Sequence, residues 1–308
     1  MPKKKNIRLQ SLHKIAIVFI MGFFFTAISA QKSAETSTDT ALINKEQLIS
    51  DIIQKMSQSD DVIERNLYND SLILELEQFM EIEGAMIYDF QKLSGISILS
   101  PKSKNIVIMT WELANELDEI RYYGLITMIE HKSDKVVYVL RDSSASVRNA
   151  ENAYMFANRW YGAIYYDVRE VKSKGDVYYI LLGLNRSKNL IKERIIEVLS
   201  NMGEPRFGKE VFNFSQRVMM KRLVYPHAAN TDMSISFIED GLIVMDHLSP
   251  SKPVYEGKFE YYVPDLSFDA LRLKKGIWDY EEDFDAKLDK NLKDRYYNME
   301  LPEQKKIY

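Results

Sequence analysis

The chain has 308 residues, no cysteine and a formal net charge of −4, from 41 basic and 45 acidic side chains. The absence of cysteine excludes disulfides, zinc–thiolate sites, cysteine nucleophiles and the lipid-attachment residue of bacterial lipoproteins. The acidic balance gives no electrostatic reason to expect nucleic acid or an anionic membrane surface as a partner.

Residues 1–30 are predicted to be a signal peptide. Basic residues precede an apolar run over 15–26, and the small residues Ala27, Ser29 and Ala30 then offer a peptidase site before Gln31. An uncleaved membrane anchor is the alternative, but the apolar run is shorter than the ~20 residues that a spanning helix needs. We therefore expect export to the periplasm, the cell envelope or the exterior, with no stable membrane span after cleavage.

Two segments follow the signal peptide. Residues 31–43 are small and polar and predict a flexible linker, and residues 44–92 predict a helical N-terminal segment. Apolar residues recur at helical spacing from Leu48 onward, with Asn44 as the expected cap. A second helix is expected after Asp70 and is ended by Gly84.

Residues 93–285 predict an antiparallel β domain, followed by a polar C-terminal tail over 286–308. The hydrophobic period changes from 3.6 to 2, and short turn-rich gaps favour hairpins. The expected strands are 95–99, 105–111, 121–130, 135–141, 159–170, 176–184, 193–200, 210–214, 217–225, 232–238, 241–247, 267–274 and 277–282. The predicted fold class is mainly β (α+β), with antiparallel meanders forming a sandwich, an open barrel or a small propeller-like body.

Two motif matches fail on their chemistry. Residues 203–210 fit a phosphate-binding loop until Glu210, which stands where a Ser or Thr should hold magnesium, and a strand rather than a helix is expected to follow. Residues 249–252 match the Ser-x-x-Lys of penicillin-recognising enzymes, but Pro250 and Pro253 break the helix that this motif needs. Both segments are interpreted as turns.

Histidines and acidic residues supply the candidate catalytic groups. After the signal peptide the histidines are His131, His227 and His247, and no pair has the spacing of a helical metal site. Asp246 and His247 point to opposite faces of a strand, so they cannot form a dyad by adjacency alone. The candidate catalytic set is Asp246, His247, Asp265 and Asp269, with a satisfied structural histidine as the alternative. No metal and no cofactor are predicted, since the acidic run 279–289 has Leu288 where a calcium loop needs glycine.

Clustered aromatic residues supply the candidate ligand-binding groups. They are Trp160, Tyr161, Tyr261 and Tyr262. Adjacent residues on a strand face opposite sides, so one ring of each pair is expected in the core and one outside. An outer ring suits stacking on a sugar or a partner chain, and core packing is the alternative at each position.

Four segments resemble a family of exported Bacteroidota proteins for which no activity is known. They are WYGAIYY (160–166), YYILLG (178–183), IVMDHLSP (243–250) and YYVPDLSFD (261–269). The resemblance spans roughly residues 95–285 and implies location and lineage only. Family members continue the Leu-Leu-Gly strand with a Trp-Asp-Gly-Asn-like turn, whereas this chain has Leu184-Asn185-Arg186-Ser187, so any ligand held at that turn is not implied here.

The sequence therefore favours an exported, non-enzymatic protein that binds an envelope protein or a glycan through aromatic and acidic surface. A carboxylate-dependent hydrolase of the glycan class is one alternative. A structural subunit of an envelope assembly, docked through its N-terminal helices, is the other.

Overall fold

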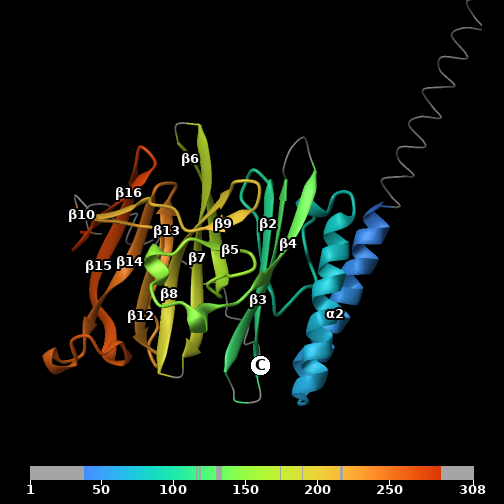
Figure 1. Ribbon diagram of the computed structural model, residues 1–308, viewed down its shortest axis with the longest axis horizontal. Coiled ribbons are helices and arrows are strands. Elements are labelled where there is room, and N and C mark those ends of the chain that lie inside the picture. Colours follow the sequence, from blue (N-terminus) through green and yellow to red (C-terminus); the bar gives the residue numbers. More distant parts are fainter. Residues whose placement is uncertain are drawn as a thin grey trace, which may run out of the picture.

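A computed structural model describes residues 38–285, except residues 116, 118, 130–133, 174, 189, 216 and 217. The predicted signal peptide and C-terminal tail lie outside the described residues, as does His131. Two helices, a first sheet, a middle sheet and an outer sheet are stacked side by side (Figure 1). The mainly β, antiparallel fold class with N-terminal helices is confirmed, as a stack of sheets in which none of the described sheets closes into a barrel.

The helical layer forms because both helices pack buried apolar residues against the first sheet. The first helix covers residues 38–58 of the described chain, so residues 38–43 of the predicted linker are already helical. The second, α2 (Val62–Glu81), begins at Asp61, whose carboxylate accepts a hydrogen bond from the amide of Ile63. The predicted cap Asn44 and the predicted start of the second helix after Asp70 are therefore wrong, because both residues lie inside helices. Gly84, at φ 84°, lies just past the end of α2 as predicted.

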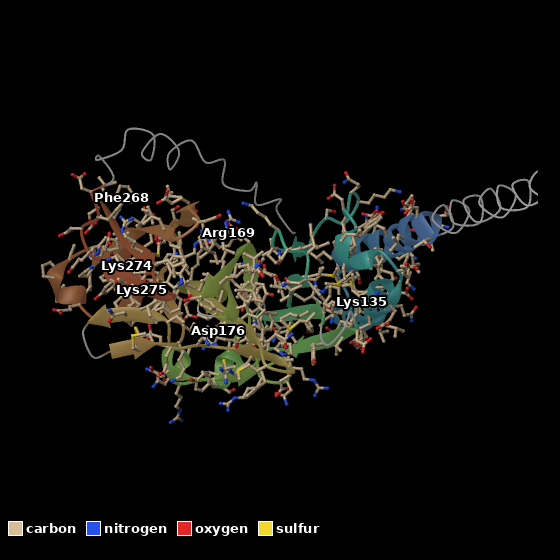
Figure 2. All side chains as sticks on the ribbon, turned by 90° about the horizontal axis from the view of Figure 1, so that it is seen from above. Lys135, Arg169, Asp176, Phe268, Lys274 and Lys275 are labelled. Carbon is tan, nitrogen blue, oxygen red and sulfur yellow. The ribbon has the colours of Figure 1, made fainter. Side chains whose placement is uncertain are left out.

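The first sheet lies between the helices and the middle sheet. Its strands run in the order β1 (Ser97–Leu99), β2 (Ile106–Ala114), β3 (Ile120–Ile129) and β4 (Lys135–Arg141), all antiparallel. On β2, Ile106 and Ile108 face the middle sheet, whereas Val107 and Met109 face the helices. Lys135 Nζ donates to the carbonyls of Met80 and Ile82 at the end of α2, and Figure 2 shows Lys135 beside the helices.

The middle sheet is covered on both faces. Its strands run in the order β5 (Met155–Phe156), β9 (Pro205–Phe207), β8 (Ile191–Asn201), β7 (Asp176–Lys188) and β6 (Ile164–Ser173), and β12 (Leu223–Ala228) pairs with the start of β8. Leu181 and Ile195 pack toward the first sheet, whereas Ile180 and Ile196 pack toward the outer sheet. This double burial explains why β7 and β8 contain unbroken apolar runs.

The outer sheet closes the stack at the end farthest from the helices. Its strands run in the order β11 (Val218–Met220), β10 (Phe212–Ser215), β16 (Ile277–Glu281), β15 (Tyr262–Lys274), β14 (Leu242–Pro250) and β13 (Ile235–Glu239). The pair β10 and β16 is parallel, and the other pairs are antiparallel. Phe268, Lys274 and Lys275 lie at this end of the molecule in Figure 2.

One predicted strand divides between two sheets. The pattern over 217–225 predicts a single strand, but β11 belongs to the outer sheet and β12 to the middle sheet. The break falls at Arg222, whose side chain is wholly buried in an ion pair with Glu197. The amides of Lys221 and Arg222 both donate to the carbonyl of Glu151. These contacts turn the chain from one sheet to the next.

The false phosphate-binding loop over 203–210 is followed by a strand, β10, as predicted. The loop itself is a turn only in part: Gly203 has φ 89°, and the unpredicted short strand β9 then pairs with β8. Gly208 has φ 91°, and a Cβ atom there would lie 2.8 Å from the carbonyl oxygen of Ala153, so only glycine fits. Glu210 forms an ion pair with Lys221 at 3.0 Å.

Candidate functional site

The candidate site lies at a bulge between β14 and β15. Asp246 pairs with Phe268 and Leu248 pairs with Pro264, so residues 265–267 of β15 oppose the single residue His247 of β14. A bulge of this kind re-aims side chains and interrupts the ladder. Here it brings His247 close to two carboxylates of β15.

The first carboxylate, Asp269, is buried and bonded to His247. Its Oδ2 lies 2.8 Å from His247 Nδ1, and its Oδ1 accepts a hydrogen bond from the amide of Asp283 at 3.3 Å. Asp269 is 4% exposed, whereas the side chain of His247 is 28% exposed. A partly exposed imidazole is thus oriented by a buried carboxylate.

Two tyrosines surround the inner side of Asp269. Burial raises the pKa of Tyr280, and its hydrogen bond to Asp269 and the charge of that carboxylate raise it further. The ring of Tyr280 also stacks on Phe214 with the centroids 4.4 Å apart. The hydroxyl of Tyr225, from β12, is buried nearby and has no hydrogen-bond partner among the described residues. The cluster therefore joins the outer sheet to an edge of the middle sheet.

The second carboxylate, Asp265, fixes the shape of the bulge. Its Oδ1 accepts hydrogen bonds from the amide and the hydroxyl of Ser267, at 3.1 and 2.7 Å, and its Oδ2 accepts one from the hydroxyl of Ser249. Slight burial would raise the pKa of Asp265, but these hydrogen bonds and the nearby His247 hold it below its ordinary value. Asp265 is therefore a charged, exposed group beside His247.

The charge of His247 depends on its acidic neighbours. Burial alone would lower the pKa of His247, but the hydrogen bond to Asp269 and the charges of Asp269, Asp265 and Glu282 raise it above its ordinary value. The site is thus a histidine that holds its proton to higher pH among three carboxylates.

Three of the four predicted catalytic residues converge, and the fourth does not. His247, Asp265 and Asp269 form the cluster described above. Asp246 lies apart, where its Oδ2 accepts a hydrogen bond from the amide of Ser234 at 2.7 Å, just before the edge strand β13. Its observed hydrogen bond supports the edge of the sheet.

The predicted ligand-binding aromatics divide into two groups. Trp160 and Tyr161 are 0% and 4% exposed and lie in the core between the first and middle sheets, so neither ring is available to a ligand at the surface. Tyr161 donates to Glu193 at 2.7 Å. Tyr261, by contrast, is 41% exposed and stacks on Tyr255 with the centroids 4.1 Å apart. Tyr262 packs against Phe259 and accepts a hydrogen bond from the amide of Gly257.

The most exposed apolar residue near the site was not predicted. Leu266, between Asp265 and Ser267, is 90% exposed and has φ 75°. Val254 and Phe259, in the connection between β14 and β15, are also exposed. We call residues 251–261 and 265–267 together the tip. The sequence did contain a signal for this exposure. Pro, Asp and Ser surround a single leucine, and these residues are typical of a turn, where an apolar side chain is exposed to solvent.

Comparison with known proteins gives no further guide. No family model matches this chain, and neither the curated proteins nor the solved structures include a significant match. Across the described residues, no three histidine, aspartate or glutamate side chains are gathered as a metal site would require. No helix in the described part of the chain is long and apolar enough to cross a membrane.

Replacing His247 by Gln is expected to lower the melting temperature more at pH 5 than at pH 8. The folded-state pKa of His247 lies above its unfolded value near 6.5. Its stabilising contribution is therefore complete below about pH 6.5 and is lost as the pH rises through the folded-state pKa. Melting temperatures of the wild type and His247→Gln between pH 5 and 9 measure the difference.

His227 provides the control, because its pH dependence has the opposite sign. His227 is wholly buried and burial lowers its pKa, with Arg194 and Lys192 adding to the effect. Its neutral form favours folding above about pH 6.5, and this contribution is lost as the pH falls below that value. His227→Gln is expected to weaken the loss of stability in acid. A His247→Gln difference that stays constant with pH would contradict a charged imidazole at the site.

Proposed function

We propose that this chain is an exported, non-enzymatic binding protein that holds a partner protein of the cell envelope at the tip. The observation that carries the proposal is Leu266, which is 90% exposed in a left-handed backbone conformation. A leucine in this conformation costs about 1–2 kcal/mol. Strain of this kind is concentrated at functional positions, where the surrounding structure holds it in place.

Hydrogen bonds join the two strands on both sides of Leu266. Asp265 accepts hydrogen bonds from both Ser267 and Ser249, and so ties β15 to β14 on one side of the leucine. His247 and Asp269 tie the same two strands together at the bulge. Because these hydrogen bonds restrain the bulge, we expect the leucine to lose less backbone freedom on binding than a residue in an unrestrained loop would.

The rest of the tip has the composition of a protein interface. Val254, Phe259 and Tyr261 are 72%, 43% and 41% exposed, and charged residues of both signs, among them Lys258 and Glu260, lie between them. Aromatic residues within a polar rim are typical of interfaces, and isolated soluble chains seldom gather exposed apolar side chains in this way.

A protein suits the tip better than a glycan. Sugars are held by flat aromatic faces together with hydrogen-bonding groups. Here Tyr255 and Tyr261 use one face of each ring on the other, and the most exposed group is aliphatic. A leucine side chain offers a sugar neither a flat face nor a hydrogen bond, whereas it fits an apolar pocket on a protein.

A second candidate, hydrolysis, is favoured by the contact between His247 and Asp269. A buried carboxylate that orients a partly exposed histidine is the arrangement of a general base. Glycoside hydrolysis needs two available carboxyl groups, and Asp265 is exposed. Asp269, however, is already bonded to His247, Tyr280 and the amide of Asp283, so the second carboxyl group is occupied.

Replacing Leu266 by Asp is expected to abolish capture of the partner without loss of stability. The substitution removes the apolar anchor, and Asp tolerates a left-handed backbone better than Leu does. The measurement is affinity capture from envelope extract by wild type, Leu266→Asp and Leu117→Asp, with quantification of each captured protein. Leu117 is a matched control because it is an exposed leucine, at 76%, in the connection between β2 and β3 of the first sheet and outside the tip.

A protein captured by the wild type and by Leu117→Asp but not by Leu266→Asp supports the proposal. Equal capture by all three forms would overturn it. Binding to a glycan panel that depends on Leu266 would replace the protein partner with a sugar. Turnover of glycosides that is lost in His247→Gln would favour the second candidate instead.

A further inference from the structure

A second surface, on the outer face of the helical layer, is independent of the tip. Three large apolar residues of α2 point away from the first sheet: Ile63, Leu67 and Leu74 are 68%, 62% and 52% exposed. At 3.6 residues per turn they fall within about 40° of one line along the helix. They form a row along the exposed face of the helix, with Asp70 between Leu67 and Leu74, and we call these three residues the α2 stripe.

The neighbouring helix extends this surface. Lys45 Nζ donates to Gln78 Oε1 at 2.7 Å and is paired with Glu75. These contacts place two helical turns side by side. The turn of the first helix contains Leu48, and the turn of α2 contains Leu74. Leu48 is itself 44% exposed. The first helix therefore adds an exposed leucine close to these contacts.

The charges around the stripe have one dominant sign. The exposed charged residues of α2 are Glu64, Asp70 and Glu81, all acidic. The only basic residue of α2, Arg65, is directed to the first sheet, where its guanidinium donates to the carbonyl of Ala114. The exposed face of the first helix adds Asp51 and Lys55, one charge of each sign, so the surface stays acidic.

This charge pattern discriminates between occupants. Two copies of the chain that met through α2 would bring acidic side chains against acidic side chains, which opposes association. A partner with basic side chains around an apolar stripe would pair with Glu64, Asp70 and Glu81 while it covered the leucines. We propose that the α2 stripe binds a basic amphipathic helix of another protein.

The probe for this proposal is a pair of synthetic helical peptides that share a leucine stripe. One carries lysine at the flanking positions and the other carries glutamate. Fluorescence anisotropy with the purified wild-type chain at low salt is expected to show at least tenfold tighter binding of the lysine peptide. The preference is expected to fall as salt is raised, since the charges that steer it are exposed.

Variants separate the stripe from general attraction between an acidic protein and a basic peptide. The triple variant Ile63→Ser, Leu67→Ser and Leu74→Ser keeps every charge and is expected to lose the binding. Asp70→Asn with Glu81→Gln is expected to weaken it several-fold, whereas Asp240→Asn, a change at an exposed acid of the outer sheet, is expected to leave it unchanged. Melting temperatures confirm that the variants are folded, which is expected because the substituted side chains are exposed.

Three results would overturn the proposal. The first is equal affinity of the two peptides for the wild type. The second is undiminished binding of the lysine peptide to the triple serine variant, which would show that net charge alone attracts it. The third is a dimer in sedimentation velocity that Leu67→Asp dissociates, which would make a second copy the occupant. Leu266→Asp is expected to bind the lysine peptide normally, so the proposed function and this proposal fail separately.

Discussion

Arg222→Met is expected to lower the free energy of unfolding by about 3–5 kcal/mol, the cost of leaving a buried carboxylate without its partner. The side chains of Arg222 and Glu197 are both 0% exposed. Arg222 Nε bonds Glu197, and Nη1 bonds the carbonyl of Ala150. Methionine fills much of the same volume, so the loss measures the charge pair more than a cavity.

The pH dependence of the variant tests the same mechanism. Burial already raises the pKa of Glu197, although Arg222 and hydrogen bonds to its carboxylate oppose that shift. Without Arg222 the carboxyl group is expected to take up a proton on folding, because a lone buried carboxylate is costly. A raised folded-state pKa favours folding at low pH and loses that benefit as the pH rises. The difference in the free energy of unfolding between wild type and Arg222→Met should therefore become smaller at acidic pH.

Urea unfolding of three further proteins makes the result specific. Arg272 pairs with Glu281 at the surface, with side chains 36% and 31% exposed, so Arg272→Met is expected to cost under about 1 kcal/mol. The double variant Arg222→Met with Glu197→Leu is expected to recover most of the loss, since no buried charge remains. Glu197→Leu alone should be destabilised like Arg222→Met. A loss below about 1 kcal/mol for Arg222→Met would show that water reaches Glu197.

Strand positions followed from local pattern, whereas the stacking of sheets did not. Alternation and turn residues located β4 over 135–141 as observed, because side-chain direction has a period of two in any strand. The short strands β5 and β9 were missed, since two or three residues carry too little pattern. The division of 217–225 depends on a contact between Arg222 and Glu197, which are distant in sequence. Local periodicity contains no information on such a contact.

The helix starts were wrong for a related reason. Asp61 caps α2, but the apolar residues that follow it, Ile63 and Leu67, face outward and so disturb the amphipathic pattern. The pattern becomes regular only from Leu72, which placed the predicted start at Asp70. Ile63 and Leu67, which obscured the start of the helix, are two of the three residues of the α2 stripe, so the misplaced boundary and the exposed surface share a cause.

The candidate site was predictable in its residue types and not in its geometry. His247, Asp265 and Asp269 were selected because each can carry charge chemistry, and the bulge then brought them together. Alternation alone could not decide which aromatic ring of each pair is buried, and Trp160 and Tyr161 are both in the core. Leu266 was missed because its exposure depends on a positive φ, which no hydrophobic pattern encodes.

The three tryptophans of the chain mark the three interfaces of the stack. Trp111 lies between the helices and the first sheet, Trp160 between the first and middle sheets, and Trp278 between the middle and outer sheets. Replacing one of them therefore perturbs one interface. Trp111 has the added role of bonding the helical layer to the first sheet, since its Nε1 donates to Asn69 Oδ1 at 2.7 Å.

Trp111→Ala is expected to cost about 3–5 kcal/mol in the free energy of unfolding, the range for truncating a buried aromatic residue. Trp111 is 1% exposed and stacks on Tyr123. Its loss also leaves the side-chain oxygen of Asn69, which is 2% exposed, without its donor. Urea unfolding followed by circular dichroism measures the change without reliance on the removed fluorophore.

Hydrogen exchange measures which elements lose stability in Trp111→Ala. Among the described sheets the helices pack on the first, so amides of residues 38–87 are expected to exchange faster in Trp111→Ala while β7 and β8 keep their protection. Trp111→Phe with Asn69→Leu removes the hydrogen bond but keeps an aromatic ring, and should recover part of the stability. If β7 and β8 lost protection as much as the helices, the four layers would unfold as one unit. In that case the α2 stripe could not respond to a partner independently of the sheets.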